Sequence, residues 1–158
     1  MMKSIPVWKQ ELSDGVHAAR LASLYCCAPA ETASEAARYA AVLDGLEKTF
    51  GSHAEAGLYS APGRTEIGGN HTDHQHGRVL AGSVNIDMIA AAAPNDKNQL
   101  RVQSEGYDLC IIDLNDLEAR KEEENTTASL LRGECAAFTQ RGAKLAGLDV
   151  YISSNVPK

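Results

Sequence analysis

The most polar stretch of the chain, Ala61–Gly77 (APGRTEIGGNHTDHQHG), holds the side chains best suited to chemistry. A loop that only joins two strands needs one or two special residues, so this density indicates a functional segment rather than a long polar hairpin with a few caps. The guanidinium of Arg64 carries a fixed charge on a planar fork, which can stabilise a transferring phosphate or orient an acidic partner. The carboxylate of Asp73 can accept hydrogen bonds from two neighbouring hydroxyls at once. The structural alternatives are a surface arginine after a turn, and a helix or turn cap at Thr72 or Asp73.

A metal site is the alternative chemistry within the same stretch. Imidazole and carboxylate groups are good ligands for zinc and similar ions, and they recur at His71, Asp73, His74 and His76. In an extended chain, alternation places His74 and His76 on one face and the other two on the opposite face. A four-ligand site would therefore need a tight loop, and we predict no metal ligands here.

The stretch resembles the first signature of galactokinases, a branch of the GHMP family of small-molecule kinases. That signature reads Pro-Gly-Arg-Val-Asn-Leu-Ile-Gly-Glu-His-Thr-Asp-Tyr-Asn-x-Gly. Eight residues match it in register without a gap: Pro62, Gly63, Arg64, Gly69, His71, Thr72, Asp73 and Gly77. Eight identities at fixed spacing are far more specific than a lone glycine-rich pattern.

The resemblance implies a sugar kinase, which positions one sugar hydroxyl and stabilises the spread negative charge of a transferring phosphoryl group. It implies that Arg64 stabilises the transition state and that Asn70, His71, Thr72 and Asp73 line the sugar site. Asn70 departs from the family, which has a Glu that holds the far hydroxyl of galactose. Because charge-assisted hydrogen bonds are the stronger ones, we expect this change to weaken galactose binding by about 1–2 kcal/mol, or to shift the preference to another sugar.

The end of the chain carries the second part of the resemblance. The phrase Asp149–Pro157 (DVYISSNVP) is similar to the one that, in galactokinases, leads into a glycine-rich loop. That loop holds the nucleotide phosphates on backbone N–H groups at the start of a helix. We therefore expect a truncated kinase that uses ATP and Mg²⁺ through a missing C-terminal part, and that is inactive as an isolated chain.

The periodicity changes from helical to extended near residue 56. Before it, apolar residues at three- and four-residue spacing predict helices interrupted at Ser13–Gly15 and at Cys27–Ala30, with a longer helix after Ser34 that ends at Gly51. After it, we expect a short strand at Leu58–Ala61, a turn at Pro62–Gly63 and a partner strand at Arg64–Ile67. Further strands are predicted at 79–93, 100–104, 109–114 and 148–153. The charged run 115–125 is expected to be a solvated linker before a helix at 128–145, capped by Thr126 or Thr127.

Composition excludes several classes of protein. The net charge is −6 and no basic stripe is present, which argues against nucleic-acid binding. No apolar run approaches the length of a membrane span, and the N-terminus lacks a signal peptide. The four cysteines form no metal-binding or CxxC spacing, so we expect reduced thiols in a cytoplasmic protein.

These observations predict one α+β domain over residues 1–158. We expect a mixed, mostly antiparallel sheet with helices on one side, similar to the GHMP-kinase N-terminal domain (a ribosomal-protein-like fold), with residues 1–55 as a helical extension and 56–158 as the signature domain. The expected function is that of the N-terminal fragment of a galactokinase-like enzyme, which phosphorylates galactose or a related sugar at its anomeric hydroxyl. The alternative is a galactokinase-like sugar-binding or sensor protein without catalysis. The expected partners are a small sugar and ATP, and a homodimer through the truncated face.

Overall fold

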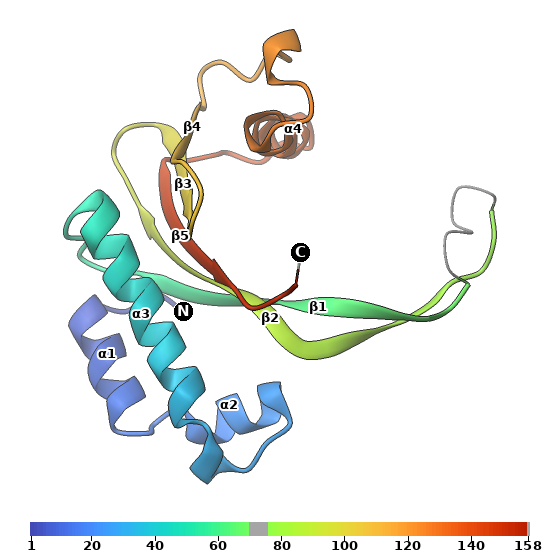
Figure 1. The fold of residues 1–158 in the computed structure, drawn as a ribbon. Helices are drawn as coiled ribbons and strands as arrows, with labels where there is room; N and C mark the ends of the chain where they lie inside the picture. Colours follow the sequence, from blue (N-terminus) through green and yellow to red (C-terminus); the bar gives the residue numbers. More distant parts are fainter. Residues whose placement is uncertain (70–75, 158) are drawn as a thin grey trace.

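The computed structural model describes residues 1–69 and 76–157 and shows a mixed sheet with helices packed against it (Figure 1). Its strands are β1 (Gly57–Gly68), β2 (Leu80–Pro94), β3 (Gln99–Ser104), β4 (Cys110–Asp113) and β5 (Leu148–Ser154). They are ordered β1-β2-β5-β3-β4, and only β3 and β5 run parallel among the described residues. The expected α+β class with a mostly antiparallel sheet is therefore confirmed.

The N-terminal helices are α1 (Ile5–Ser13), α2 (Ala18–Tyr25) and α3 (Ala33–Phe50). The predicted interruption between the first two is confirmed: Gly15 adopts a φ of +71°, which favours glycine and ends α1. Gly51, at a φ of +88°, ends α3 as predicted. The short 3₁₀ helix η1 (Pro29–Glu31) fills the predicted turn before α3.

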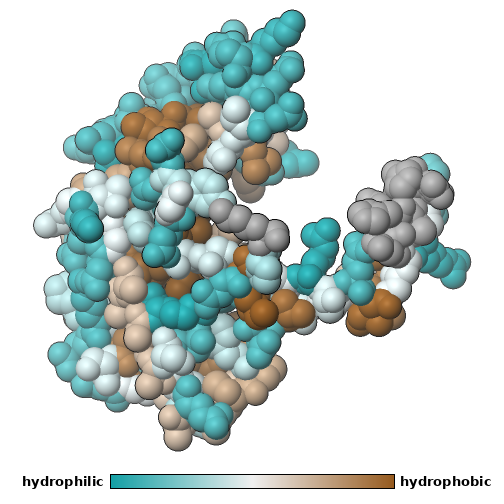
Figure 2. Space-filling view, viewed as in Figure 1, coloured by the Kyte–Doolittle hydropathy of each residue, from teal (hydrophilic) through white to brown (hydrophobic). Residues whose placement is uncertain are grey.

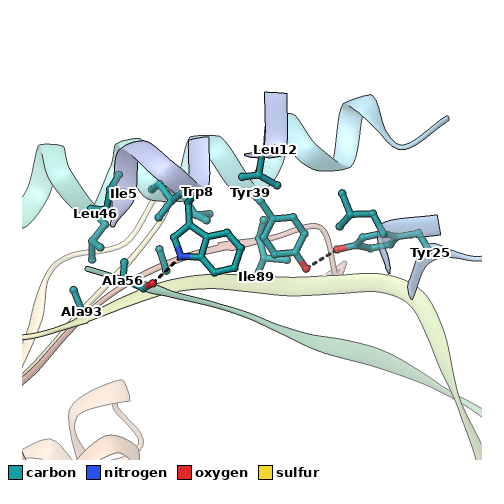
Figure 3. Close-up of a cluster of buried hydrophobic side chains, with 13 residues drawn as sticks. Ile5, Trp8, Leu12, Tyr25, Tyr39, Leu46, Ala56, Ile89 and Ala93 are labelled. Atoms are coloured by element: carbon teal, nitrogen blue, oxygen red, sulfur yellow. Dashed lines mark hydrogen bonds between the residues drawn. The ribbon is translucent and has the colours of Figure 1, made fainter. Parts of the chain in front are cut away.

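The core joins these helices to the sheet (Figure 3). Leu43 and Leu46 of α3 and Ile89 of β2 are completely buried against one another. The indole Nε1 of Trp8 donates a 2.8 Å hydrogen bond to the carbonyl oxygen of Ala56, which ties α1 to the start of β1. The small residues Ala91 and Ala93 of β2 are also completely buried in this core.

The predicted turn at Pro62–Gly63 is wrong, because β1 runs through both residues as one continuous strand. Pro62 lies opposite Asp87, and the register then shifts so that Arg64 lies opposite Ser83. β1 is an edge strand, so a proline that cannot donate a hydrogen bond is tolerated there, and the bulge absorbs the irregularity. The turn residues therefore mark a bend in a strand, and the true hairpin partner of β1 is β2.

The helix α4 (Thr127–Gln140) lies at the other end of the molecule from α1–α3, beside β4 (Figure 1). Tyr151 of β5 packs against Gly45 of α3, whereas Ile152, the next residue, lines a cavity shared with Thr127. Successive strand residues point to opposite faces, so α4 borders the face that α3 leaves uncovered. Thr126 caps α4 as predicted, its hydroxyl accepting from the Ser129 N–H.

The predicted end of the last helix at residue 145 is wrong, because α4 stops at Gln140. Gly142 follows at a φ of +86° and ends the helix. Gly147 packs against the turn after β2: a Cβ added there would lie 2.7 Å from the Asn95 carbonyl oxygen. The strands predicted at 79–93, 100–104, 109–114 and 148–153 are confirmed as β2–β5 within a residue or two.

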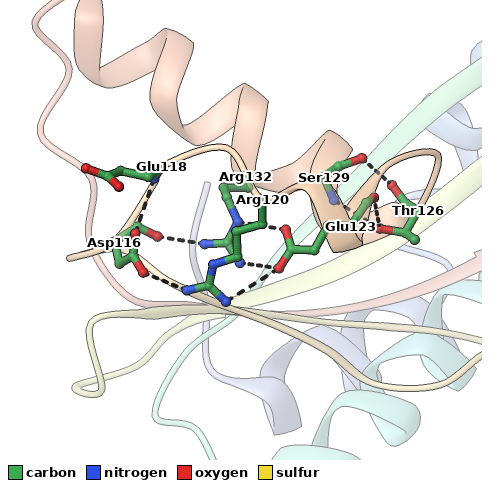
Figure 4. Close-up of polar contacts among 7 residues, drawn as sticks. All are labelled: Asp116, Glu118, Arg120, Glu123, Thr126, Ser129 and Arg132. Carbon is green, nitrogen blue, oxygen red and sulfur yellow. Dashed lines mark hydrogen bonds and ion pairs between the residues drawn. The ribbon is translucent and has the colours of Figure 1, made fainter.

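The charged run 115–125 is mostly exposed, as predicted, but Arg132 anchors it to α4 (Figure 4). This guanidinium is only 4% exposed. It donates to the carboxylate of Glu123 through Nε and Nη2, at 2.8 and 2.6 Å, and to the carbonyl oxygen of Asp116. The run also contains a short 3₁₀ helix, η3 (Lys121–Glu123).

We expect Arg132→Ala to lower the free energy of unfolding by about 2 kcal/mol, because it leaves the Asp116 carbonyl and Glu123 without their donors. Residues 115–125 should then be cut faster by a protease that cleaves after glutamate. Arg141→Ala, at the exposed end of α4, is the matched control and should change neither quantity. Equal cleavage rates for the two variants would contradict the anchoring role.

None of the helices in the described ranges is long and apolar enough to cross a membrane. All four cysteines are free of disulfide bonds.

Candidate functional site

The described residues of the signature stretch, 61–69 and 76–77, lie on and beside an arm formed by β1 and β2 (Figure 1). Beyond the register shift after Pro62, the two strands pair with no third strand in the described part of the chain, and Arg64, Thr65 and Glu66 are exposed. Arg64 therefore stands on the arm, available to a ligand. The other expected site residues, Asn70, His71, Thr72 and Asp73, lie outside the described residues, so the sugar site that they are expected to line stays a prediction.

Glycine is required where the arm meets the polar run. Gly69 has a φ of +85°, and a Cβ added there would lie 2.1 Å from the carbonyl oxygen of Arg78. Backbone from the two sides of the signature therefore approaches more closely than any side chain allows. Of the four residues weighed as metal ligands, only His76 is described; it is exposed, with a φ of +59°.

A buried carboxylate lies at the root of the arm, which is the point where Pro62 of β1 pairs with Asp87 of β2. Asp87 of β2 is 2% exposed and accepts hydrogen bonds from the Tyr25 hydroxyl at 2.6 Å, the Ser60 hydroxyl at 2.6 Å and Nη2 of Arg38 at 3.0 Å. Burial by itself raises the pKa of Asp87, but the hydrogen bonds from Ser60, Tyr25 and Arg38 outweigh it and lower the pKa below 3.8. Burial, followed by the hydrogen bond to Asp87, raises the pKa of Tyr25 far above its usual range, so the phenol stays a donor.

A second buried carboxylate, Asp149 of β5, holds the body of the sheet together. It accepts from Arg101 of β3, from His53 after α3, and from Asn95 in the turn after β2. Burial raises the pKa of Asp149, and the three donors reverse that effect and lower it. The arm and the body are thus each fixed by one buried, ionised aspartate.

These two aspartates predict a loss of stability in acid. Both pKa values fall below the ordinary value of 3.8, so the unfolded chain takes up protons at a higher pH than the folded chain does. Their stabilisation is complete above about pH 5 and declines as the pH falls through about 4 and below. The urea midpoint should therefore drop steeply over that interval, and less steeply in Asp87→Asn. An identical pH profile for the wild type and this variant would contradict the assignment.

A cavity of about 670 Å³ opens on the face of the sheet opposite α3, between α4 and the arm (Figure 2). Its wall is mostly apolar and includes Met88, Val102 and Ile152, with Thr127 of α4 at its border. The closing phrase of the chain also lines it, through Val156 and Pro157. The segment that carries the second part of the sequence resemblance thus lines a cavity.

Asp87 is the residue of this region that the sequence did not single out. It lies inside VLAGSVNIDMIAAAA, which reads as an apolar strand. The available signal was a lone carboxylate in such a run, because a buried charge must be paired. Its partners could not be inferred, since Tyr25 and Arg38 come from helices far away in the sequence.

Comparisons with known proteins agree with the sequence resemblance. The family model for the galactokinase galactose-binding signature matches residues 46–94. The chain is 30% identical over 118 residues to the galactokinase of Lacticaseibacillus casei, and 29% identical over 112 residues to that of Streptomyces coelicolor. The first alignment covers 73% of this chain and 30% of its relative; the second covers 71% and 29%. The chain thus spans about a third of the length of these relatives.

The fold comparison gives the same answer. The crystal structure of Lactococcus lactis galactokinase complexed with galactose superposes with a TM-score of 0.64 at 22% identity, covering 73% of this chain and 30% of that one. The fold is that of the N-terminal domain of a GHMP small-molecule kinase. Within that class, sequence and fold both relate the chain to the N-terminal part of the galactokinases.

Proposed function

We propose that this chain is the sugar-binding N-terminal part of a galactokinase-like enzyme, which transfers phosphate from ATP to the anomeric hydroxyl of galactose or a related sugar. The observation that carries the proposal is the galactose-binding signature, matched over residues 46–94 and carried on the β1–β2 arm. The eight identities at fixed spacing, including Arg64 and Asp73, support the same reaction.

Each signature residue has a task in this reaction. Asp73 accepts hydrogen bonds from sugar hydroxyls, and Asn70, His71 and Thr72 line the same pocket. Arg64, exposed on the arm, stabilises the charge that spreads over the phosphoryl oxygens in the transition state. Asn70 offers an amide where the family has a carboxylate, so the far hydroxyl of the sugar meets a neutral group.

The resemblance assigns the nucleotide side of the reaction to the glycine-rich loop that follows the closing phrase in galactokinases. Within the described ranges, no group of three or more His, Cys, Asp or Glu side chains could hold a metal ion, so no Mg²⁺ ligand is assigned here. The cavity at Val156 and Pro157 supports placing ATP beside the closing phrase. On that basis we propose that the isolated chain binds sugar without turning it over.

The experiment is a galactose titration followed by calorimetry, with a galactose 1-phosphate assay on the same samples after ATP and Mg²⁺ are added. We expect saturable binding and no product from the 158-residue chain. Product formation would refute the proposed inactivity, and failure to bind galactose or any related monosaccharide would refute the sugar-binding role.

A non-catalytic sugar sensor is the second candidate, and Asn70 is the observation that favours it. Restoring the family residue with Asn70→Glu tests whether this departure is what weakens galactose binding. If the family contact is the missing element, this variant should bind galactose about tenfold more tightly, the value of one charge-assisted hydrogen bond. An unchanged or weaker affinity would indicate a pocket adapted to another ligand.

We also propose that the chain self-associates. Apolar side chains that border the cavity remain accessible, among them Met88 at 43% exposure, and such surfaces seek partners. Sedimentation velocity should show a concentration-dependent dimer that Met88→Glu weakens; a monomer at every concentration would contradict this. The four free thiols support a reducing compartment such as the cytoplasm.

A further inference from the structure

Among the residues that the structure describes, the direction of the signature-carrying arm is fixed mainly at its root, where β1 and β2 join the rest of the sheet. Beyond the register shift, Arg64–Gly68 and Leu80–Ser83 pair with no other strand in residues 1–69 and 76–157, and most of their side chains are exposed. An isolated two-stranded ribbon is only marginally stable in water. Whatever fixes the root therefore fixes where the signature lies relative to the body.

Asp87 occupies that root. The regular pairing of β1 with β2 runs from Gly57 opposite Ala92 to Pro62 opposite Asp87. Beyond Asp87, toward the tip of the arm, the register shifts so that Arg64 lies opposite Ser83. Its carboxylate gathers donors from three elements: Tyr25 at the end of α2, Arg38 in α3 and Ser60 in β1. Arg38 also pairs with Glu35, so the guanidinium is itself held in place.

The same residue reaches the closing phrase of the chain. Its backbone carbonyl oxygen accepts a 3.0 Å hydrogen bond from the Asn155 N–H. Next to it, Gly63 leaves room for this segment: a Cβ there would lie 3.2 Å from the Ile86 carbonyl oxygen and 3.3 Å from Cγ2 of Val156. The root of the arm and the segment that borders the cavity are thus in direct contact.

We propose that Asp87 is a positioning residue, which locks the signature arm at a fixed angle to both the helical body and the closing segment 155–157. Its side chain joins the arm to α2 and α3, and its carbonyl joins the arm to Asn155. This interpretation rests on the proposed function. There, Asp87 would hold the arm with the sugar-binding signature in a fixed position relative to the segment beside which we propose that ATP binds. A misplacement of about 1 Å between reacting groups is enough to lower the rate a hundredfold. A residue that fixes the orientation of the arm would therefore contribute to the rate.

The test compares two similarly buried aspartates, Asp87 at the root of the arm and Asp149 in the body of the sheet. Asp87→Asn and Asp149→Asn each replace a fully hydrogen-bonded carboxylate with an amide of the same shape. Amide hydrogen exchange is measured on the 158-residue chain under conditions where both variants are folded. Because local opening of the arm is read separately from global unfolding, we expect amides of Arg64–Gly68 and Leu80–Ser83 to exchange about tenfold faster in Asp87→Asn only.

Equal acceleration of the arm in both variants, or no acceleration in either, would overturn the proposal. If Asp87→Asn does not fold, Tyr25→Phe removes one donor and keeps the ring, and it should speed exchange in the arm by a smaller factor. Unchanged exchange in that variant would equally overturn it.

Galactose provides an independent readout. Asp87→Asn should weaken its binding about tenfold, while Asp149→Asn leaves it unchanged. If the wild-type chain binds no galactose, the proposed function fails, and the exchange comparison still decides the role of Asp87.

Discussion

Gly69→Ala should weaken galactose binding about a hundredfold, because no side chain fits where the arm meets the signature. The φ of +85° costs an L-residue roughly 1–2 kcal/mol. The added methyl would also lie 2.1 Å from the Arg78 carbonyl oxygen and 2.9 Å from the Cα of Val79. Both are backbone atoms, which cannot rotate away as a side chain can, so the two ends of the signature must move apart.

The neighbouring glycine is the matched control. A Cβ added at Gly68 meets nothing within 4 Å, and its φ is not in the left-handed region. Gly68→Ala should therefore bind galactose like the wild type. Calorimetric titration of both variants checks the pair, and equal affinities for Gly68→Ala and Gly69→Ala would contradict the account of the loop.

Asp149→Ala should lower the free energy of unfolding by about 3 kcal/mol, which corresponds to a fall of roughly 10 °C in the melting temperature. The carboxylate is completely buried and joins three otherwise separate parts of the body. Its removal leaves Arg101 without its buried counter-charge. His53, whose Nδ1 already has no partner among the described residues, loses its other hydrogen bond too.

Asp108→Ala is the control for this change. Asp108 is an exposed carboxylate in the loop between β3 and β4, and its loss should change the free energy of unfolding by less than about 0.5 kcal/mol. Urea unfolding followed by circular dichroism measures both. A loss below about 1 kcal/mol for Asp149→Ala would show that the cluster contributes little beyond its own desolvation cost.

The sequence predicted most of the fold because its apolar spacing matches the elements that formed. Leu43 and Leu46 recur on one face of a helix, and Val102 alternates with polar neighbours in a strand. The failures came where tertiary structure overrides a local signal. Pro62 and Gly63 are turn residues in isolation, but at the edge of this sheet they form a bend within a strand.

The candidate site likewise has residues that the sequence predicted and a residue that it did not. Fixed spacing between Arg64 and Asp73 identified the signature without any coordinates, because the motif is contiguous in the chain. Asp87 could not be found in that way, since its role depends on donors from α2 and α3 that only the folded chain assembles. Site residues that are contiguous in the sequence could be predicted, whereas the residue that positions them through tertiary contacts could not.

Asp73 is the residue through which we propose that the signature binds a sugar. The direct measurement is a calorimetric titration of galactose into the wild-type chain and into Asp73→Ala, with circular dichroism showing that both are folded. The account predicts saturable binding by the wild type and none by the variant. Equal binding by the two proteins, or no binding by either, would contradict it.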